Sequence, residues 1–350
     1  MRSRLLIVIL AAACFLGGIG GGATAWVIFG ANTGPYDDAR SVILPRGTTL
    51  DAAVDSLEAE GILGSSATFR LVATATGWGA QLKPGHYRIS SYTSNYRLLD
   101  TLRRGLQDPV RLTIPPGARP ERVARVAGRR LELSRDSFRR ALHDTSFARS
   151  LGTTPPHLFG YMLPNTYEFY WQTPPETVIR RVKEAFDRFY DTELAAGGDS
   201  LNLSKQELVT LASIVEWEAI LDAEKPKIAG VYLNRLERGW RLQADPTVQY
   251  ALIESEGTRT GRVLYEDLEM EHPYNTYQIS GLPPGPITNP SPSSLRAVAH
   301  PTQHRYFYFA ASGDGGHTFS RTLREHNRAA EKYHEMLDRR ERQQEQSDDE

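Results

Sequence analysis

The sequence predicts an α+β protein of several domains behind an apolar N-terminal segment. A short apolar strand, a turn and an amphipathic helix occur twice between residues 41 and 128, which favours small α+β units. Longer stretches with apolar residues at helical spacing follow in the C-terminal half. The 350 residues suffice for two or three domains, and 40% apolar with 24% charged residues is typical of a folded chain.

The composition excludes several classes of function. The 41 Lys and Arg residues and 42 Asp and Glu residues give a net charge of −1, whereas a nucleic-acid partner would require a basic face. The single cysteine, Cys14, lies in the apolar segment, so the body has no thiol nucleophile, disulfide or zinc–thiolate site. His300 and His304 have Pro301 between them, and no third ligand is evident. We therefore expect no metal and no cofactor.

Residues 1–30 are predicted to form a transmembrane anchor. No charged residue occurs from Leu5 to Phe29, a run of 25 residues that is long enough to cross a bilayer about 30 Å thick. Arg2 and Arg4 precede this run and predict a cytoplasmic N-terminus, with the body outside the cell (inner) membrane. A cleaved signal peptide is the alternative, but its apolar part normally spans only about 7–15 residues.

After a linker at residues 31–40, the strand–turn–helix pattern predicts two related small units, one at residues 41–110 and one at residues 111–155. The second copy of the turn, Leu112-Thr-Ile-Pro-Pro-Gly117, repeats the first copy, Ile43-Leu-Pro-Arg-Gly47. Units of this kind would either bind a ligand or act as spacers. Turn chemistry alone does not separate these two possibilities, because Pro and Gly are required by the backbone itself.

The largest predicted domain covers residues 156–337. An amphipathic helix at residues 174–192 is predicted to be closed by Gly197-Gly198. A further helix at residues 322–337 is predicted to end the domain. Residues 338–350 are charged and rich in Gln, so we expect a disordered tail.

A core helix that carries two glutamates is the most informative feature of this domain. Ser204, with Glu207 three residues later, forms a capping-box pattern, and apolar residues then recur at helical spacing. Burial at the edge of an apolar face raises the pKa of a carboxyl group, which allows it to donate a proton near neutral pH. Glu216 and Glu218 meet this condition, although a helical glutamate more often lies on a solvated flank.

The two glutamates are not equivalent. Positions two apart on an α-helix point about 200° apart, so these carboxyl groups cannot face each other as in a retaining glycosidase. Glu218 follows Ile214 and Val215 by one turn, whereas the corresponding neighbours of Glu216 are an alanine and a serine. Glu218 should therefore lose more hydration, but this difference alone does not decide between the two.

Six short motifs surround this helix in a fixed order. They are Gly160-Tyr-Met-Leu-Pro-Asn-Thr-Tyr167, Asn234-Arg-Leu236, Arg241-Leu-Gln-Ala-Asp-Pro-Thr-Val-Gln-Tyr250, Tyr274-Asn-Thr-Tyr277, Gly281-Leu-Pro-Pro-Gly-Pro-Ile287 and His317-Thr-Phe319. Together with the helix they resemble the YceG-like endolytic murein transglycosylases, the MltG family of bacterial cell-envelope enzymes, over approximately residues 40–335. No single motif is specific, but their order behind a membrane segment is.

The resemblance implies an endolytic lytic transglycosylase, a lyase that acts on nascent peptidoglycan and terminates strand elongation. The family's catalytic acid falls on Glu218, which would protonate the oxygen between N-acetylmuramic acid and N-acetylglucosamine. The same residue would then deprotonate the sugar's own 6-hydroxyl group, which gives a 1,6-anhydro end. The resemblance also implies a LysM-like first unit, a catalytic domain at residues 156–337, and peptidoglycan strands and cell-wall synthases as partners.

Polar residues after the helix are candidates for substrate binding, through the acetamido and hydroxyl groups of the glycan. They are Gln243, Asp245, Thr247, Tyr250 and Asn275. Each could instead serve the fold, since Asp245 followed by proline favours a turn. Two other functions stay open. One is a non-catalytic glycan-binding scaffold of the wall-synthesis machinery, and the other is a water-using glycosidase with Glu218 as acid and Asp245 as base.

Overall fold

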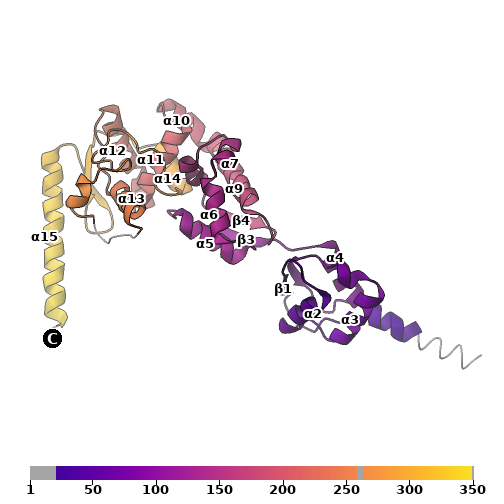
Figure 1. The fold of residues 1–350 in the computed structure, drawn as a ribbon. Helices are drawn as coiled ribbons and strands as arrows, with labels where there is room; N and C mark the ends of the chain where they lie inside the picture. The colour runs from indigo at the N-terminus through magenta and orange to yellow at the C-terminus, as the bar shows by residue number, and fades with distance from the viewer. Residues whose placement is uncertain (1–20, 258–262, 349–350) are drawn as a thin grey trace, which may run out of the picture. The chain divides into compact units, whose positions relative to one another are not determined.

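A computed structural model describes residues 21–257 and 263–348 (Figure 1). Contacts within the chain divide it into two units. Unit 1 contains the described residues up to Arg111 together with residues 130–132 and 168–173, and unit 2 contains the remainder. Helices and short two-stranded sheets occur in both units, which confirms the predicted α+β class.

Unit 1 is built from a two-stranded antiparallel sheet and short helices, after a helical stretch at residues 21–29. The two strands pair from Arg40 opposite Ile89 to Leu44 opposite Gly85. The elements are β1 Arg40–Leu44, α2 Leu50–Ala59, α3 Ser66–Ala75, the 3-10 turn η1 Trp78–Gln81, β2 Gly85–Ile89 and α4 Asn95–Arg104. The predicted first small unit, residues 41–110, lies within unit 1.

The residues before the three α-helices of unit 1 explain where each helix begins. Thr49, Ser65 and Ser94 have extended backbone, and each accepts a hydrogen bond from an N–H group three residues later. Such N-caps satisfy amide groups that have no partner inside the helix. Apolar side chains from the sheet and all three helices then form one core, which includes Leu44, Leu57, Phe69, Tyr87 and Leu98.

The chain after unit 1 is mostly helical. Its helices are α5 Pro120–Arg130, α6 Arg135–His143, α7 Thr145–Ser150, α8 Pro155–Leu158, α9 Pro175–Phe189, α10 Ala195–Ser200, α11 Lys205–Glu218, α12 Lys225–Glu237, α13 Asp245–Glu256, α14 Pro292–Ala299 and α15 Leu323–Asp348. Its strands are β3 Val110–Ile114 paired with β4 Asn165–Phe169, and β5 Tyr308–Ala311 antiparallel to β6 His317–Ser320. Almost all of residues 111–155, predicted as a second small unit, belong to unit 2.

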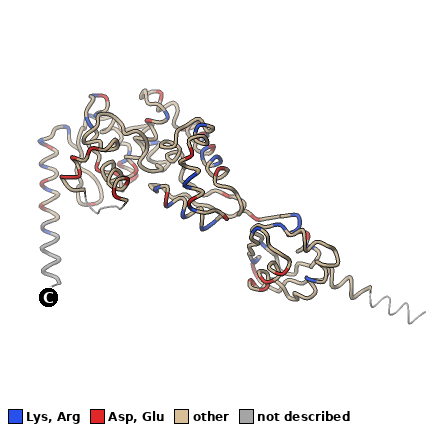
Figure 2. The backbone as a smooth tube through the Cα atoms, viewed as in Figure 1, with Lys and Arg blue, Asp and Glu red and all other residues tan. Residues whose placement is uncertain are grey.

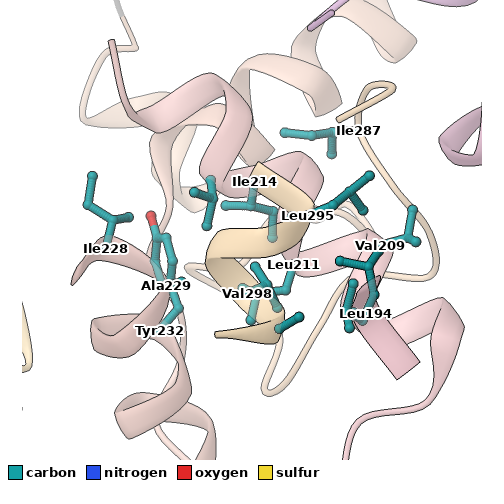
Figure 3. Close-up of a cluster of buried hydrophobic side chains, with 14 of the residues drawn as sticks. Leu194, Val209, Leu211, Ile214, Ile228, Ala229, Tyr232, Ile287, Leu295 and Val298 are labelled. Atoms are coloured by element: carbon teal, nitrogen blue, oxygen red, sulfur yellow. The ribbon is translucent and has the colours of Figure 1, made fainter. Parts of the chain in front are cut away.

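The core of unit 2 surrounds α11 (Figure 3). All eight residues from Leu208 to Val215 are buried, so this helix has no solvated face along its middle. Contacts from α12, α13 and α14 cover it. The Ser213 hydroxyl donates to the carbonyl of Thr210 at 2.7 Å and accepts from the Ile287 N–H at 3.0 Å, so this buried hydroxyl group is satisfied.

Two local expectations differ from the structure. Gly197-Gly198 does not end a helix, because α9 ends at Phe189 and both glycines lie inside α10. Gly197 instead lies against the backbone carbonyl of Ala299 in α14, where a Cβ atom would overlap the oxygen. Here glycine serves the close approach of two helices and not a helix stop.

The second difference is the C-terminal segment. α15 continues as a helix to Asp348, whereas the sequence predicts a disordered tail from residue 338. Residues 338–348 contain no Gly or Pro and consist mainly of Arg, Glu and Gln, which are strong helix formers. In the coloured part of α15 acidic and basic residues alternate (Figure 2), and Glu335 pairs with Arg339 one turn later at 3.8 Å.

The predicted membrane anchor falls mostly on residues 1–20, which lie outside the described residues. Residues 21–29, which continue the anchor, are helical. Within residues 21–257 and 263–348, no helix has both the length and the apolar character that crossing a bilayer requires.

A buried asparagine joins distant segments of unit 2. The Asn289 amide donates to the carbonyls of Pro115 at 3.0 Å and Met162 at 2.9 Å, and its oxygen accepts from the Ala118 N–H at 2.8 Å. The Asn289 carbonyl also accepts from the Gly117 N–H at 3.0 Å. These bonds hold the Pro-Pro-Gly turn of the second sequence copy against the segment before α14.

We expect the Asn289→Ala variant to be strongly destabilised. The substitution leaves three buried backbone groups without partners, and each such group costs about 1–3 kcal/mol. The free energy of unfolding in urea should fall by about 3 kcal/mol or more, measured on the protein in detergent micelles. The control Asn327→Ala, on the exposed surface of α15, should change it by less than about 0.5 kcal/mol. Equal stability of the two variants would contradict this role.

Candidate active site

Glu218, the predicted catalytic acid, is the last residue of α11. The helix begins with the predicted capping box. The Ser204 hydroxyl accepts from the Glu207 N–H at 3.3 Å, and the Glu207 carboxylate accepts from the Ser204 N–H at 2.9 Å. At the other end, Ala219 has extended backbone and terminates the helix. Because the middle of α11 is buried, charged side chains are accommodated only near its two ends, and Glu218 lies in the last turn.

Glu216 points away from Glu218, as their separation along the helix requires. Its carboxylate accepts from the Ser291 N–H at 3.0 Å and the Ser294 hydroxyl at 2.6 Å, and it lies 3.3 Å from the Lys225 ammonium group. The Ser291 hydroxyl donates to the same oxygen. Only 10% of the Glu216 side chain is exposed. Glu216 therefore fastens the last turn of α11 to α12 and α14.

Glu218 lines a cavity of about 360 Å³. The other polar residues around this cavity come from α12, α13, α15 and the intervening segments, and include Tyr232, Arg235, Gln243, Asp245, Tyr277 and His326. The Tyr232 hydroxyl donates to the Glu218 carboxyl oxygen Oε2 at 3.0 Å. Glu218 is half-buried, so the carboxyl group is held by the protein and is also open to the cavity.

Burial raises the pKa of Glu218 from 4.5 to about 7, and the negative charge of Asp245 acts in the same direction. The hydrogen bond from Tyr232 and the positive charge of Arg235 lower this pKa, but they offset burial only in part. The position at the C-terminal end of α11, where the helix dipole is negative, also disfavours the carboxylate. Near neutral pH this group can therefore both donate and accept a proton.

A second carboxylate, that of Asp245, lines the same cavity, and it lies at the N-terminal end of a helix. Asp245 is the first residue of α13, where unpaired N–H groups and the helix dipole favour a negative charge. The Tyr277 hydroxyl donates to Asp245 at 2.6 Å. Burial and the neighbouring Asp245 charge raise the pKa of Tyr277, so it stays protonated and remains a donor. Glu218 and Asp245 thus each have a tyrosine that fixes one carboxyl oxygen.

Gln243 also lines the cavity and has an exposed side chain. Its φ of 50° is in the left-handed region, which is uncommon for a residue other than glycine. The Gln243 N–H donates to the Thr276 carbonyl at 3.1 Å, which holds this turn in place. Strained backbone of this kind is often found at functional sites, because surrounding contacts must maintain it.

The other three predicted substrate-binding residues are Thr247, Tyr250 and Asn275. In the described part of the chain they do not line this cavity and instead support its walls. Thr247 and Asn275 are fully buried, and the side chain of each donates to backbone carbonyl groups. Tyr250 packs against Tyr274 with ring centroids 4.6 Å apart. All three lie in the segments that carry Asp245 and Tyr277, so their contacts hold these segments in position.

Sequence reasoning assigned no role to Tyr232, Arg235 and His326, which all face the cavity. Arg235 lies in the Asn234-Arg-Leu236 motif, and Tyr232 precedes it by three residues, so helical spacing places both on one face of α12. That spacing is the signal that could have found them. His326 has no such signal, because tertiary packing of α15 on β5 brings it to the cavity.

Arg235 supplies a fixed positive charge in the cavity wall. The side chain is only 8% exposed, and its guanidinium group donates to the carbonyls of Phe307 at 2.7 Å and Leu242 at 2.6 Å. Burial lowers the pKa of Arg235 from 12.5, but a guanidinium group stays charged at neutral pH. Burial and this positive charge also lower the pKa of His326, which favours its neutral form.

The cavity therefore combines one carboxyl group that titrates near pH 7, one carboxylate at a helix N-terminus and one buried guanidinium group. This set suits general acid–base chemistry on a polar, uncharged substrate. Among residues 21–257 and 263–348, no group of three or more His, Cys, Asp or Glu side chains is arranged to hold a metal ion.

Comparison with known proteins identifies the family. The model of the YceG-like family matches residues 42–332, so the chain belongs to this family. The endolytic murein transglycosylase of Bacillus subtilis (strain 168) is 30% identical over 311 residues, which cover 84% of each chain. That of Streptococcus pneumoniae (serotype 2, strain D39) is 27% identical over 310 residues, which cover 80% of this chain and 55% of the relative.

A solved structure is also similar. The crystal structure of a putative YceG-like protein from Listeria monocytogenes has 29% sequence identity and a TM-score of 0.59, and the match covers 84% of this chain and 99% of that chain. The family predicted from six motifs and one helix is thus confirmed by comparison over most of the chain.

Two substitutions beside Glu218 should shift its pKa in opposite directions. Asp245→Asn removes a negative charge that disfavours the carboxylate, so the pKa of Glu218 should fall below about 7. Tyr232→Phe removes a hydrogen bond that favours the carboxylate, so this pKa should rise. Infrared titration of the carboxyl band that disappears in Glu218→Gln measures both shifts. Shifts of the same sign in the two variants would refute the electrostatic account.

Proposed function

We propose that this member of the YceG-like family is a lytic transglycosylase that cuts the glycan strands of peptidoglycan at internal positions. The observation that carries the proposal is the Glu218 carboxyl, which titrates near pH 7 in the wall of a polar cavity. Relatives that cover most of this chain are named endolytic murein transglycosylases, which supports peptidoglycan as the substrate.

In the first step, protonated Glu218 donates its proton to the oxygen that joins N-acetylmuramic acid to N-acetylglucosamine. The bond between that oxygen and the muramic C1 atom then breaks, and the N-acetylglucosamine end leaves as an alcohol. Tyr232 donates to Oε2 of Glu218, so this hydrogen bond orients the carboxyl group for the transfer. The raised pKa keeps part of the population protonated at neutral pH.

In the second step, the Glu218 carboxylate removes the proton of the 6-hydroxyl group on the same muramic residue. The freed oxygen attacks C1 and closes a 1,6-anhydro ring, so water is not consumed and the carboxyl group regains its proton. One residue suffices for both proton transfers because it acts first as acid and then as base. A pKa near 7 suits both roles, since neither form is strongly disfavoured.

Asp245 and Arg235 supply the electrostatic part of the mechanism. Cleavage at C1 develops positive charge on the sugar ring, which a carboxylate in the same cavity stabilises. Asp245 fits this role because it lines the same cavity as Glu218 and its carboxyl oxygen is held by the Tyr277 hydroxyl. Gln243 and Arg235 line the cavity and would donate hydrogen bonds to acetamido and hydroxyl oxygens. Thr247, Tyr250 and Asn275 would act through the walls that they support.

The proposal extends to location. Residues 1–30 would cross the cell membrane once, with the N-terminus in the cytoplasm and the body outside, where nascent strands are made. Unit 1 would act as a LysM-like glycan-binding module, and cell-wall synthases would be the partners whose strands the enzyme terminates. The support for the orientation is the pair Arg2 and Arg4 before a run without charge.

A water-using glycosidase is the second candidate, because Asp245 places another carboxylate in the same cavity. Asp245 would then activate a water molecule, and the new muramic end would be a reducing sugar. The asymmetry between the two carboxyl groups favours the lytic reaction, since only Glu218 has the surroundings of a proton donor. A scaffold without activity would need no such group.

We expect Glu218→Gln to abolish cleavage. The amide keeps the size of the side chain and a contact to Tyr232, but it cannot supply a proton, so the rate should fall about a hundredfold or more. The assay follows release of soluble fragments from peptidoglycan. Glu256→Gln, an exposed residue on α13, is the matched control and should keep full activity. Loss of activity in Glu216→Gln but not in Glu218→Gln would move the acid to Glu216.

The same variant should be more stable than the wild type at pH 8. The pKa of Glu218 is about 7 in the folded state and near 4.5 in the unfolded chain, so ionisation opposes folding as the pH rises through this window. Glutamine lacks this penalty, and the gain should be about 3 kcal/mol at pH 8 and vanish near pH 4. Unfolding in urea at both pH values measures it and shows that the fold is retained.

The chemistry of the product separates the two enzymatic candidates. In heavy-oxygen water, a lytic reaction on uncrosslinked glycan strands should give internal cuts with 1,6-anhydro ends that carry no label. Mass spectrometry of the fragments detects both features. Labelled reducing ends would indicate that water attacks C1 and would favour Asp245 as base. Retained glycan binding without any product would favour the scaffold.

A further inference from the structure

The helix at residues 21–29 is fastened to unit 1 by buried amide groups. The Asn95 amide donates to the Val27 carbonyl at 2.9 Å, and the Asn32 amide donates to the Asn95 side-chain oxygen at 2.6 Å. The Asn32 oxygen accepts from the Ser65 N–H at 2.8 Å. Both asparagines are buried, and Val27 packs against the core of unit 1. The helix therefore leaves unit 1 in a fixed direction, beside α3 (Figure 1).

Large apolar side chains are exposed around this helix. We call them the juxtamembrane surface, and they are Trp26 (68% exposed), Phe29 (64%), Leu71 (61%), Tyr92 (69%) and Tyr96 (42%). The rings of Phe29 and Tyr96 lie 5.5 Å apart, so these two side chains adjoin each other. Tyr92 has a φ of 56°. The carbonyl of the next residue, Thr93, accepts hydrogen bonds from the N–H groups of Asn32 and Thr33, which follow the helix.

An apolar groove of about 390 Å³ lies within this surface. Residues of the helix form one wall and residues of α3 form the other, and they include Ala23, Val27, Ile28, Leu71, Val72 and Ala75. Nothing in the described part of unit 1 fills this groove. Apolar area of this extent on one face of a small unit marks an interaction site.

We propose that the juxtamembrane surface lies against the lipid bilayer, with its aromatic rings at the headgroup level and the groove occupied by acyl chains. This inference rests on the anchor in the proposed function and is independent of the cleavage chemistry. The uncharged run from Leu5 continues directly into residues 21–29, so the bilayer lies at the point where the helix enters unit 1. Because the helix is fastened to unit 1, the adjoining surface is brought to the same depth.

The kinds of side chain favour lipid over a neighbouring protein. Trp and Tyr have an apolar ring and a polar group, and they are enriched where a membrane meets water. Three of the five residues are of these types. A dry contact with a partner helix would instead favour small residues that allow close packing of backbones. Unit 1 would therefore rest on the membrane as one piece with its anchor, and not on a flexible tether.

The test places nitroxide labels on the full chain in lipid nanodiscs that contain no other protein. Cys14→Ala removes the native thiol, and single cysteines are then introduced at Leu71, in the surface, or at Ile43, a 43% exposed residue on β1 of the same unit. Discs of phosphatidylethanolamine and phosphatidylglycerol supply the bilayer. Power saturation compares access of oxygen, which enters lipid, with access of a water-soluble nickel chelate.

We expect the ratio of oxygen access to nickel access to be several-fold higher at position 71 than at position 43. Equal nickel access at both positions would overturn the proposal. Protection of position 71 that requires an added synthase would also overturn it, since the occupant would then be a protein. Both labelled chains should keep their cleavage activity, because neither residue lines the catalytic cavity.

Two further measurements, a label at Ala11 and the cleavage activity of the same samples, separate this inference from the proposals on which it depends. A label at Ala11 reports the anchor alone: if it enters lipid while position 71 does not, the anchor stands and the bilayer contact of unit 1 fails. If neither position enters lipid, both fail. Cleavage of peptidoglycan by the same samples reports the proposed activity separately, whatever the labels show.

Discussion

The burial of α11 is the constraint on which the site depends. Eight consecutive residues of this helix are inaccessible, so charged side chains are accommodated only near its two ends. Glu216 is satisfied there by two serines and Lys225, which fastens the helix end. Glu218 receives one hydrogen bond, from Tyr232, and keeps a raised pKa. The same core that stabilises unit 2 therefore raises the pKa of this carboxyl group and fixes where it lies.

Local rules predicted the starts of helices well, because the groups that cap them are close in sequence. The Ser204–Glu207 capping box is an example, since both partners lie within one turn. The rules failed at Gly197, where the requirement is close contact with Ala299, about a hundred residues away. They also failed for residues 338–348, because high charge was interpreted as disorder although most of these residues are strong helix formers. Contacts between distant segments are what a local pattern does not contain.

The site was predictable to a different degree at each residue. Glu218 followed from its apolar neighbours together with the family resemblance, and Gln243 and Asp245 were found because polar residues cluster after α12. Thr247 lies in the same motif as Gln243 and Asp245, and Asn275 lies in the next motif. The side chains of both donate hydrogen bonds to backbone carbonyl groups instead of facing the cavity. A sequence motif records that residues occur together and does not record which of them face the cavity and which hold its wall.

The two carboxyl groups lie at opposite kinds of helix end. Glu218 ends α11, where carbonyl groups repel a negative charge, whereas Asp245 begins α13, where N–H groups attract one. Because both helix ends open into one cavity, two carboxyl groups in different surroundings lie together in its wall. Burial is the largest cause of the raised pKa of Glu218, and its place at a helix C-terminus acts in the same direction. Tyr232 and Tyr277 each donate to one carboxyl oxygen and so orient the two groups in the cavity wall.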